Sequence, residues 1–234
     1  MKVYPVIHIT SPEVAETQAD LAFDLGADGV YLIDHISSVE NLFETFNRVK
    51  TKHPSEFVGI NPLLPAGALG GLRLLKNAFA NGNLKYMPDG LWIDQAGKTQ
   101  EEIESIGTFK TENPELRTVK LLGGVAFKYT NEYTDEPTVA AELAKKAAPF
   151  MDVVTTSGEG TGKPPSVEKI KAMKMTANTP IAIASGISPE NVAQYAGYAD
   201  EVLVASSVET SPYSGVFSKE RLKELIDGAH SGSQ

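Results

Sequence analysis

Residues 180–190 read PIAIASGISPE, and this short stretch contains the unit from which we expect the fold to be built. Pro180–Ala184 is a continuous apolar run, typical of parallel strands that are covered on both faces. Ser185 and Gly186 then form a turn. Ser188-Pro189-Glu190 follows with an N-cap hydroxyl, a first-turn proline and an early acid, which together predict the start of a helix.

The same unit of strand, turn and helix recurs along the whole chain. Pro12–Leu25 and Val39–Lys50 each carry one apolar stripe at helical spacing. The other expected strands are Val3–Ile9, Gly29–Ile33, Phe57–Ile60, Gly90–Ile93, Thr118–Val125, Met151–Thr155 and Glu201–Ala205. Eight repeats without a composition break predict an α/β fold, a single (β/α)8 barrel of the TIM type. We place the barrel at residues 1–229 and expect 230–234, which are small and polar, to be a disordered tail.

An open, doubly wound parallel sheet is the alternative architecture. Such a sheet usually carries a glycine fingerprint directly after its first strand. The corresponding residues are Ile9-Thr10-Ser11, which contain no glycine. The sequence therefore favours the closed barrel.

The composition narrows the range of partners. The chain has 234 residues, of which 41% are hydrophobic, and a formal net charge of −9. This charge argues against nucleic acid or an anionic membrane as the main partner, because both reward clustered Lys and Arg. No apolar stretch approaches the length of a membrane span, so we expect no membrane insertion. Met1-Lys2 leads into a strand without the features of a secretion signal, and we expect a cytoplasmic protein.

The absence of cysteine excludes disulfides, thiolate catalysis and cysteine-ligated metals. An anionic ligand must therefore be captured locally, by backbone dipoles and a few cations. We expect a phosphate-containing ligand and no required cofactor. The pattern does not indicate a metal site, although a divalent cation and homo-oligomerisation stay open.

Small residues follow the seventh and eighth expected strands. Ser185 and Gly186 come after the seventh, and Ala205 and Ser206 come after the eighth. Barrels of this type often bind phosphate at the loops after these two strands, where small residues let a ligand approach free backbone amides. Simple turn formation is the alternative explanation.

The loop after the sixth expected strand is rich in glycine and hydroxyl groups. Residues 155–165 read TTSGEGTGKPP, which could wrap around a phosphate, whereas a flexible surface loop is the alternative. A nucleotide-binding P-loop does not fit, because Ser157 stands where that motif needs glycine and Pro164 where it needs Ser or Thr. The phosphate-binding residues expected from the three loops are Ser157, Gly158, Thr161, Gly162, Ser185, Gly186, Ala205 and Ser206.

Ionisable residues at the ends of other strands are the candidates for catalysis. His8, Asp34, Asp94 and Lys120 could act as acids, bases or a nucleophile, and Asn61 could bind substrate. The alternatives are a histidine bonded within the barrel, aspartates that cap loops, and a lysine that only offers charge or reaches outward. We expect most of these side chains to face a common pocket.

Other residues near these strands receive weaker interpretations. Lys128 follows the fifth strand, while His35 and His53 receive no role. Two long loops, Phe127–Asp135 and Ser206–Phe217, carry aromatic residues that suit either a lid over the site or a subunit interface.

Several segments resemble the BtpA/SgcQ family. The resemblance is strongest for DVVTTSG at 152–158, TGKPPSVE at 161–168, SGISPENVA at 185–193 and ADEVLVASS at 199–207. It extends more loosely to Val6-Ile7-His8, Val58-Gly59-Ile60-Asn61 and Val119-Lys120. The chain departs from the pattern after the second strand, where Asp34-His35 replaces an expected Glu-Asn pair, and after the fourth strand. These departures leave the substrate open.

The resemblance implies a TIM-type barrel akin to phosphate-binding enzymes, and a link to photosystem I biogenesis, the role for which the family is named. It brings no single reaction with it. The leading hypothesis is an enzyme that acts on a sugar phosphate or phosphoribosyl compound as an isomerase, lyase or transferase. The alternative is a non-catalytic assembly or regulatory protein that retains a phosphate site, because a fold alone does not establish catalysis.

Overall fold

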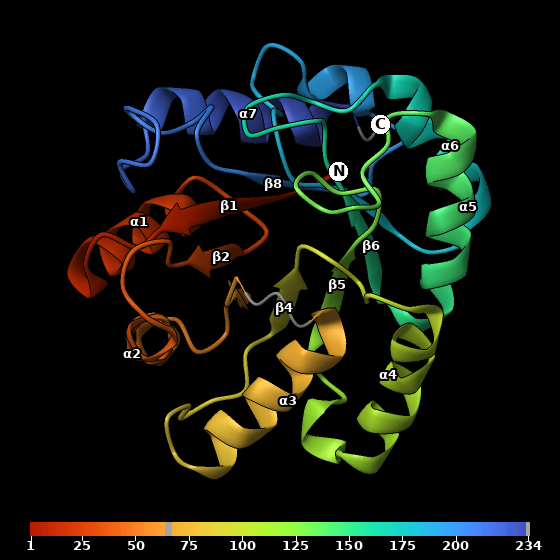
Figure 1. The fold of residues 1–234 in the computed structure, drawn as a ribbon. Helices are drawn as coiled ribbons and strands as arrows, with labels where there is room; N and C mark the ends of the chain where they lie inside the picture. The colour runs from red at the N-terminus through yellow and green to blue at the C-terminus, as the bar shows by residue number, and fades with distance from the viewer. Residues whose placement is uncertain (64–66, 233–234) are drawn as a thin grey trace.

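Eight parallel strands pair in chain order and close into a barrel in the computed structural model, which describes residues 1–63 and 67–232 (Figure 1). The strands are β1 (Lys2–His8), β2 (Val30–Ile33), β3 (Val58–Asn61), β4 (Gly90–Ile93), β5 (Lys120–Gly124), β6 (Val153–Thr156), β7 (Ile181–Ile183) and β8 (Glu201–Val204). The barrel closes where Lys2 of β1 pairs with Glu201 of β8. The expected fold class is confirmed, and each strand end lies within two residues of the expected one.

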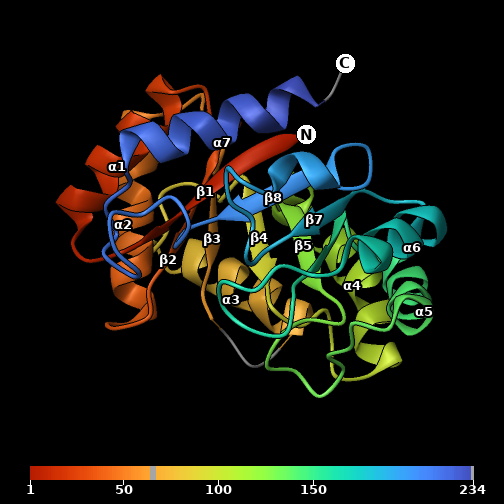
Figure 2. The same cartoon turned by 90° about the horizontal axis from the view of Figure 1, so that it is seen from above.

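Helices cover the outside of the barrel (Figures 1 and 2). They are α1 (Pro12–Asp24), α2 (Val39–Lys52), α3 (Gly67–Ala80), α4 (Gln100–Glu112), α5 (Pro137–Ala147), α6 (Val167–Ala177) and α7 (Lys219–Ser231). Ser11, Ser38 and Ser218 each accept a hydrogen bond from a first-turn amide, which stabilises the start of α1, α2 and α7. None of the helices in the described parts of the chain has the length and apolar character needed to cross a bilayer.

The connection after β7 differs from the expectation. Ser188-Pro189-Glu190 does not start an α-helix, and the helical residues between β7 and β8 are those of the short 3-10 helix η3 (Val192–Tyr195). The side chain of Asn191 accepts from the Ser188 amide and donates to the Gly186 carbonyl, which fixes a turn instead.

The C-terminal boundary also differs. α7 extends to Ser231, so His230 and Ser231, which we expected in a disordered tail, are helical. The side chain of His230 lies 3.0 Å from the Asp28 carboxylate. Residues 233 and 234 lie outside the described residues.

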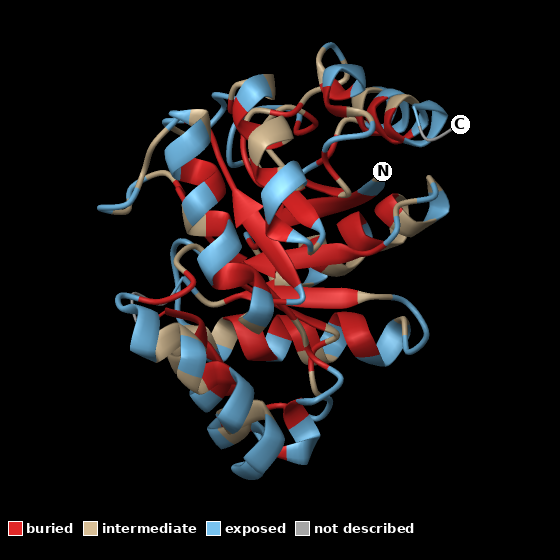
Figure 3. Ribbon diagram, turned by 90° about the vertical axis from the view of Figure 1, so that its right-hand side faces the viewer, coloured by how far each residue is buried: buried red, intermediate tan, exposed pale blue. Residues whose placement is uncertain are grey.

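Apolar side chains fill two layers, one between the strands and the helices and the other inside the barrel. The strands are coloured as buried along most of their length in Figure 3. The inner layer is built around Tyr31 and Trp92, whose rings meet edge to face at 6.2 Å. The Tyr31 ring fits because the facing strands carry glycine: a Cβ on Gly59 would lie 2.3 Å from it. Side chains therefore fill the barrel toward the N-terminal ends of its strands, and open space is left at the C-terminal ends.

Four aspartates, one before each even-numbered strand, close the N-terminal end of the barrel. Asp28, Asp89, Asp152 and Asp200 each accept a hydrogen bond from a backbone amide of the preceding odd-numbered strand. Each carboxylate also meets one basic side chain from an outer helix; these are His230, Lys50, Lys110 and Lys174, respectively. This end of the barrel is thus organised for stability, which leaves the C-terminal ends of the strands for function.

Candidate functional site

A cavity of about 730 Å³ lies at the C-terminal ends of the strands. Its walls come from both halves of the chain, from the end of β1 to the loop after β8. Its lining includes His8, His35, Trp92, Asp94, Lys128, Tyr129, Thr161, Gly162, Ser185, Gly186, Ala205, Ser206, Ser207 and Tyr213. This is the position at which TIM barrels carry their active sites.

One wall of the cavity consists of small residues. Thr161 and Gly162 after β6, Ser185 and Gly186 after β7, and Ala205 and Ser206 after β8 all line it. The backbone amides of Gly186, Ser206 and Ser207 donate to no acceptor within the described chain. Free amides on a concave, small-residue surface form a favourable place for an anion.

The loops after β6 and β7 meet at Gly186. Its φ is +68°, and a Cβ there would lie 2.1 Å from the nitrogen of Pro164. The Ser185 hydroxyl donates to the Gly160 carbonyl at 2.8 Å. Only glycine allows this approach of two backbones, so Gly186 fixes the position of the β6 loop over the cavity.

Ser157 and Gly158 do not line the cavity, contrary to our expectation. Ser157 is fully buried; its hydroxyl accepts from the Lys128 amide at 2.7 Å and donates to the Gly158 carbonyl. A Cβ on Gly158 would lie 2.3 Å from the Lys163 carbonyl oxygen. The β6 loop folds back on itself at these residues, so they support the wall and expose Thr161 and Gly162 instead.

His8 stands at the end of β1 and is held by Glu209 from the loop after β8. The distance from His8 Nδ1 to Glu209 Oε1 is 2.8 Å, and both side chains are buried. The Glu209 carboxylate also accepts from the amides of Tyr213 and Gly215. Because a carboxylate fixes the proton on Nδ1, the Nε2 atom of a neutral His8 is left as a proton acceptor. Glu209 was not among the residues predicted from the sequence, because no local pattern marks it.

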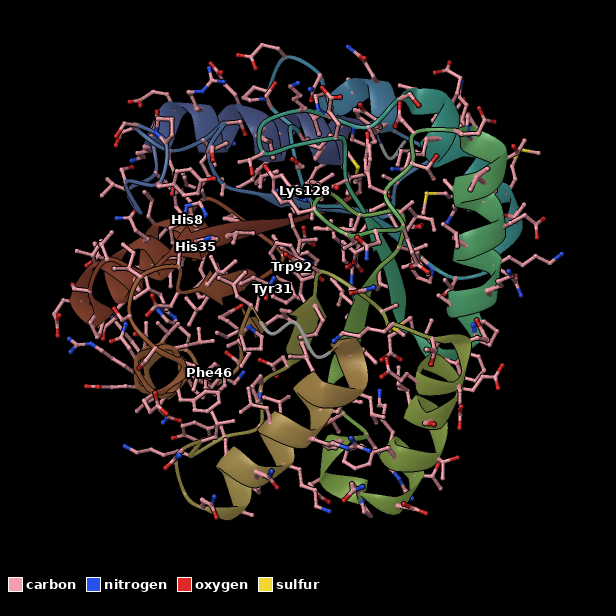
Figure 4. All side chains as sticks on the ribbon, viewed as in Figure 1. His8, Tyr31, His35, Phe46, Trp92 and Lys128 are labelled. Atoms are coloured by element: carbon pink, nitrogen blue, oxygen red, sulfur yellow. The ribbon has the colours of Figure 1, made fainter. Side chains whose placement is uncertain are left out.

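Two rings lie against His8. The ring centroid of His35 is 5.2 Å away and that of Tyr213 is 4.9 Å away. Figure 4 shows His8 and His35 next to each other, with Trp92 and Lys128 placed toward the middle of the barrel. Burial, together with the neighbouring His8, lowers the pKa of His35. His35 also lines the cavity. No role was predicted for it from the sequence, although its position directly after β2 could have pointed to the site.

Asp94, at the end of β4, is the carboxylate that lines this cavity together with His8. The side chain of Asn61 donates to its Oδ1 at 3.0 Å, while the Asn61 oxygen accepts from the Leu63 amide. Burial raises the pKa of Asp94, against the effects of Asn61 and of the Lys128 charge. Asn61 itself does not line the cavity and acts by positioning Asp94.

Lys128 approaches the same cavity from the loop after β5. Its ammonium lies 3.4 Å from the Thr161 hydroxyl, and burial lowers its pKa. Tyr129, the next residue, contacts Thr161 through its hydroxyl. The β5 and β6 loops therefore form one side of the mouth together.

Two predicted catalytic residues lie elsewhere. Lys120 is the first residue of β5, so it lies at the N-terminal end of the barrel, where it forms an ion pair with Glu201 beneath the ring of Tyr4. Asp34 caps the loop before α2: its carboxylate accepts from two loop amides and from Asn41. Burial alone would raise the pKa of Asp34, but these hydrogen bonds outweigh it and lower the pKa. Neither residue lines the cavity, so of the five side chains expected to share a pocket, His8 and Asp94 line it and Asp34, Asn61 and Lys120 do not.

A buried lysine that the sequence analysis had not singled out supports the site from behind. Lys169 of α6 is fully buried, and its ammonium donates to the carbonyls of Ala126 and Ser157 at 2.9 and 2.8 Å. These carbonyls belong to the β5 and β6 loops. Burial lowers the pKa of Lys169 to about 8.

In the described parts of the chain, no group of three or more His, Asp or Glu side chains could hold a metal ion.

The long loop 206–217 packs onto the barrel, since Gly215 approaches the His8 carbonyl so closely that a Cβ would lie 2.3 Å from it. Ser206, Ser207 and Tyr213 of this loop line the cavity, whereas Phe217 is buried in the outer core.

The fold is similar to solved barrels that cover nearly the whole chain. Thiamine phosphate pyrophosphorylase from Pyrococcus furiosus matches with a TM-score of 0.67 and 13% identity, over 100% of this chain and 97% of that one. N-(5'-phosphoribosyl)anthranilate isomerase from the same organism matches with a TM-score of 0.62 and 15% identity, over 99% of both chains. (S)-3-O-geranylgeranylglyceryl phosphate synthase from Thermoplasma acidophilum, solved with sn-glycerol-1-phosphate, matches with a TM-score of 0.63 and 16% identity, over 98% and 93%. At these identities the likeness shows the fold alone.

Two sequence comparisons bear on the family. An uncharacterized protein of Thermococcus kodakarensis, TK2179, is 24% identical over 110 residues, which is 47% of this chain and only 41% of the length of that protein. The model of the BtpA family matches residues 83–231. Since this match spans more than half of the chain, including the loops after β4 to β8 that build most of the cavity, the protein belongs to the BtpA family.

Proposed function

We propose that this protein is an enzyme that acts on a small phosphorylated molecule, a sugar phosphate or a phosphoribosyl compound, by isomerisation, lyase chemistry or group transfer. One observation carries the proposal. A single cavity combines a small-residue wall with free amides at Gly186, Ser206 and Ser207 and two ionisable groups with fixed partners, His8 and Asp94. A phosphate on the wall would hold the rest of the substrate against these groups.

His8 is suited to be the base. Its Nδ1 is bound to the buried Glu209 carboxylate, so Nε2 is free to take a proton from the substrate. The negative charge of Glu209 then stabilises the imidazolium that forms, and the amides of Tyr213 and Gly215 keep the carboxylate in place. His35, with its lowered pKa, stays neutral beside it and adds no competing charge.

Asp94 is suited to be the acid. Its raised pKa increases the protonated fraction near neutral pH, and a carboxylic acid in a mostly buried site can donate that proton to a substrate oxygen. Asn61 fixes the carboxyl group through Oδ1, which leaves Oδ2 for the transferred proton. A base and an acid on one cavity can move a proton from one substrate atom to another with no net change in the enzyme.

The comparisons support the substrate class. Three barrels of similar fold are named after a phosphate ester: thiamine phosphate, 5'-phosphoribosyl anthranilate and a glyceryl phosphate. We extend this chemistry to the present chain because its free amides lie after β7 and β8, where TIM barrels frequently bind phosphate.

The proposal is tested by screening phosphorylated sugars and nucleotides for thermal stabilisation, followed by product analysis for each ligand that binds. Ser206→Asp places a negative charge on the small-residue wall, and Ser206→Asn is its uncharged control of the same size. We expect the Asp variant alone to lose binding of inorganic phosphate. Turnover lost in His8→Gln, with binding retained, would establish the enzyme. Tight binding without chemical change of any tested compound would favour a non-catalytic assembly or regulatory protein.

A further inference from the structure

A second cavity, of about 320 Å³, adjoins the candidate site on the side of β4 and β5. It shares Leu63, Asp94, Lys128 and Tyr129 with the larger cavity and continues past them to Gln95, Lys98 and Thr130. The small-residue wall belongs to the loops after β6, β7 and β8, whereas this extension is built by the loops after β3, β4 and β5. A ligand that fills both cavities therefore crosses the barrel mouth.

Two lysines, Lys98 and Lys128, line the extension. Within the described chain, neither Lys98 nor Lys128 forms an ion pair, although many other lysines do. The ammonium of Lys128 has only a 3.4 Å contact with the Thr161 hydroxyl and lies over the rings of Phe127 and Tyr129 at 6.0 and 5.8 Å. Lys128 is half-buried, and the nearby Asp94 charge does not fully offset the cost of its desolvation, since burial still lowers the pKa of Lys128.

Asp94 is the carboxylate on this extension, and it does not form an ion pair with either lysine. Its Oδ1 is occupied by Asn61. Burial raises the pKa of Asp94, and an anion bound nearby would raise it further. The other polar side chains that line the extension, Gln95, Tyr129 and Thr130, carry no formal charge. The lining residues thus supply two ammonium groups and one carboxylate, while the Glu102 carboxylate, which is not part of the lining, accepts from the Lys98 amide.

We infer that the substrate carries a second anionic group, which binds between Lys98 and Lys128 while its phosphate lies on the small-residue wall. The inference rests on the proposed function and narrows it to elongated molecules with an anion at each end. The second group is a carboxylate or a phosphate, since both accept charge-assisted hydrogen bonds from lysine. Asp94 lies between the two ends, where a neighbouring anion favours its protonated form and so its action as an acid.

Calorimetric titration with matched pairs of ligands tests the inference. Ribulose 5-phosphate against ribulose 1,5-bisphosphate measures the effect of a second phosphate, and glucose 6-phosphate against 6-phosphogluconate measures that of a carboxylate. We expect at least one of the two compounds with a second anionic group to bind about tenfold more tightly than the singly phosphorylated compound of its pair. This gain is typical of one charge-assisted hydrogen bond. Lys98→Gln should remove most of this preference and leave the affinity for the singly phosphorylated compounds unchanged. Lys145→Gln, at an exposed lysine of α5, is the control for net charge and should keep the full preference.

The outcomes distinguish a failure of the inference from a failure of the proposed function. If inorganic phosphate and all four sugar phosphates fail to bind, the proposed function fails. If the singly phosphorylated compounds bind and a second anion adds nothing in either pair, only the inference fails. A preference that persists in Lys98→Gln, or one that Lys145→Gln lowers equally, also overturns it.

Discussion

The imidazole Nδ1 of His8 lies 2.8 Å from Oε1 of Glu209, a residue 201 positions later in the chain. Both side chains are buried, and the rings of His35 and Tyr213 cover the imidazole. The contact joins the end of β1 to the loop after β8, and so links the first and the last strand of the closed barrel. It fixes the orientation of the group that we propose as the base, and the first prediction follows from it.

Glu209→Gln should lower turnover by about ten- to a hundredfold, because glutamine keeps a hydrogen bond to His8 but not the negative charge that stabilises the imidazolium. Binding of inorganic phosphate should be unchanged. Steady-state kinetics and calorimetry measure the two quantities. The control is Glu190→Gln, an exposed carboxylate paired with Arg221, which should leave turnover at its original rate. Full activity in Glu209→Gln would rule out the assisted base.

Asp94→Asn should separate stability from function. The folded protein raises the pKa of Asp94, so it holds this proton more firmly than the unfolded chain does. The stability that this proton contributes is present at low pH and is lost as pH rises through the folded pKa. At pH 7 this preference for the proton therefore costs the wild type stability, a cost that asparagine removes, and the asparagine amide oxygen can still accept from Asn61.

Urea unfolding should consequently show Asp94→Asn to be more stable than the wild type at pH 7, with a smaller difference at pH 5. Turnover should fall at least about a hundredfold, the usual contribution of a general acid. A variant that is less stable at pH 7 would contradict the buried, proton-binding state of Asp94.

Lys169→Met should destabilise the protein by about 2–4 kcal/mol, because the carbonyls of Ala126 and Ser157 lose their buried donor. The pKa of Lys169 is about 8 in the folded protein, against an unperturbed value of 10.5. Between these two values the unfolded chain binds the proton more tightly, so this lysine makes the folded state more stable as pH rises from about 8 to about 10.5.

The difference in unfolding free energy between the wild type and Lys169→Met should therefore grow over this pH range, as urea titrations at several pH values would show. Taking the difference cancels the titration of the tyrosines. A difference that shrinks with pH would mean that the ammonium is not desolvated.

Gly186→Ala should displace the β6 loop. An added Cβ would stand 2.1 Å from the Pro164 nitrogen, and φ at this position is +68°. Gly197 is a matched control, because its φ is +82° but its Cβ would meet nothing within 4 Å. Gly197→Ala should cost about 1 kcal/mol, the usual penalty for this backbone region, whereas Gly186→Ala should cost more and weaken phosphate binding. Equal effects of the two substitutions would contradict the role of the Gly186 contact.

The fold could be predicted from local patterns. Continuous apolar runs, capping residues and glycine turns report on the chain within a few residues, and eight repeats of one unit leave a closed barrel as the simplest way to cover every strand. The glycines and serines after β7 and β8 were found in the same way. Even so, η3 replaces the expected helix between these strands, because the side chain of Asn191 closes a turn that competes with it.

The identity of the site residues depended on position along a strand, which sequence patterns define only to within a residue or two. Lys120 and Asp94 both lie on or beside an expected strand, yet Lys120 is at the first residue of β5 and Asp94 follows the last residue of β4. They therefore lie at opposite ends of the barrel. Asp34 follows β2 as Asp94 follows β4, but the amides of its own loop occupy its carboxylate.

The sequence by itself thus determined the eight-fold alternation, the small-residue turns and the positions of His8 and Asp94 near strand ends, because these follow from interactions between near neighbours in the chain. Only the tertiary structure decided which side chains meet. Glu209 reaches His8, and Lys169 reaches Ala126 and Ser157, across separations from 12 to 201 residues. Such pairs form when the barrel closes and buried polar groups must find partners, a requirement that leaves no periodic mark in the sequence.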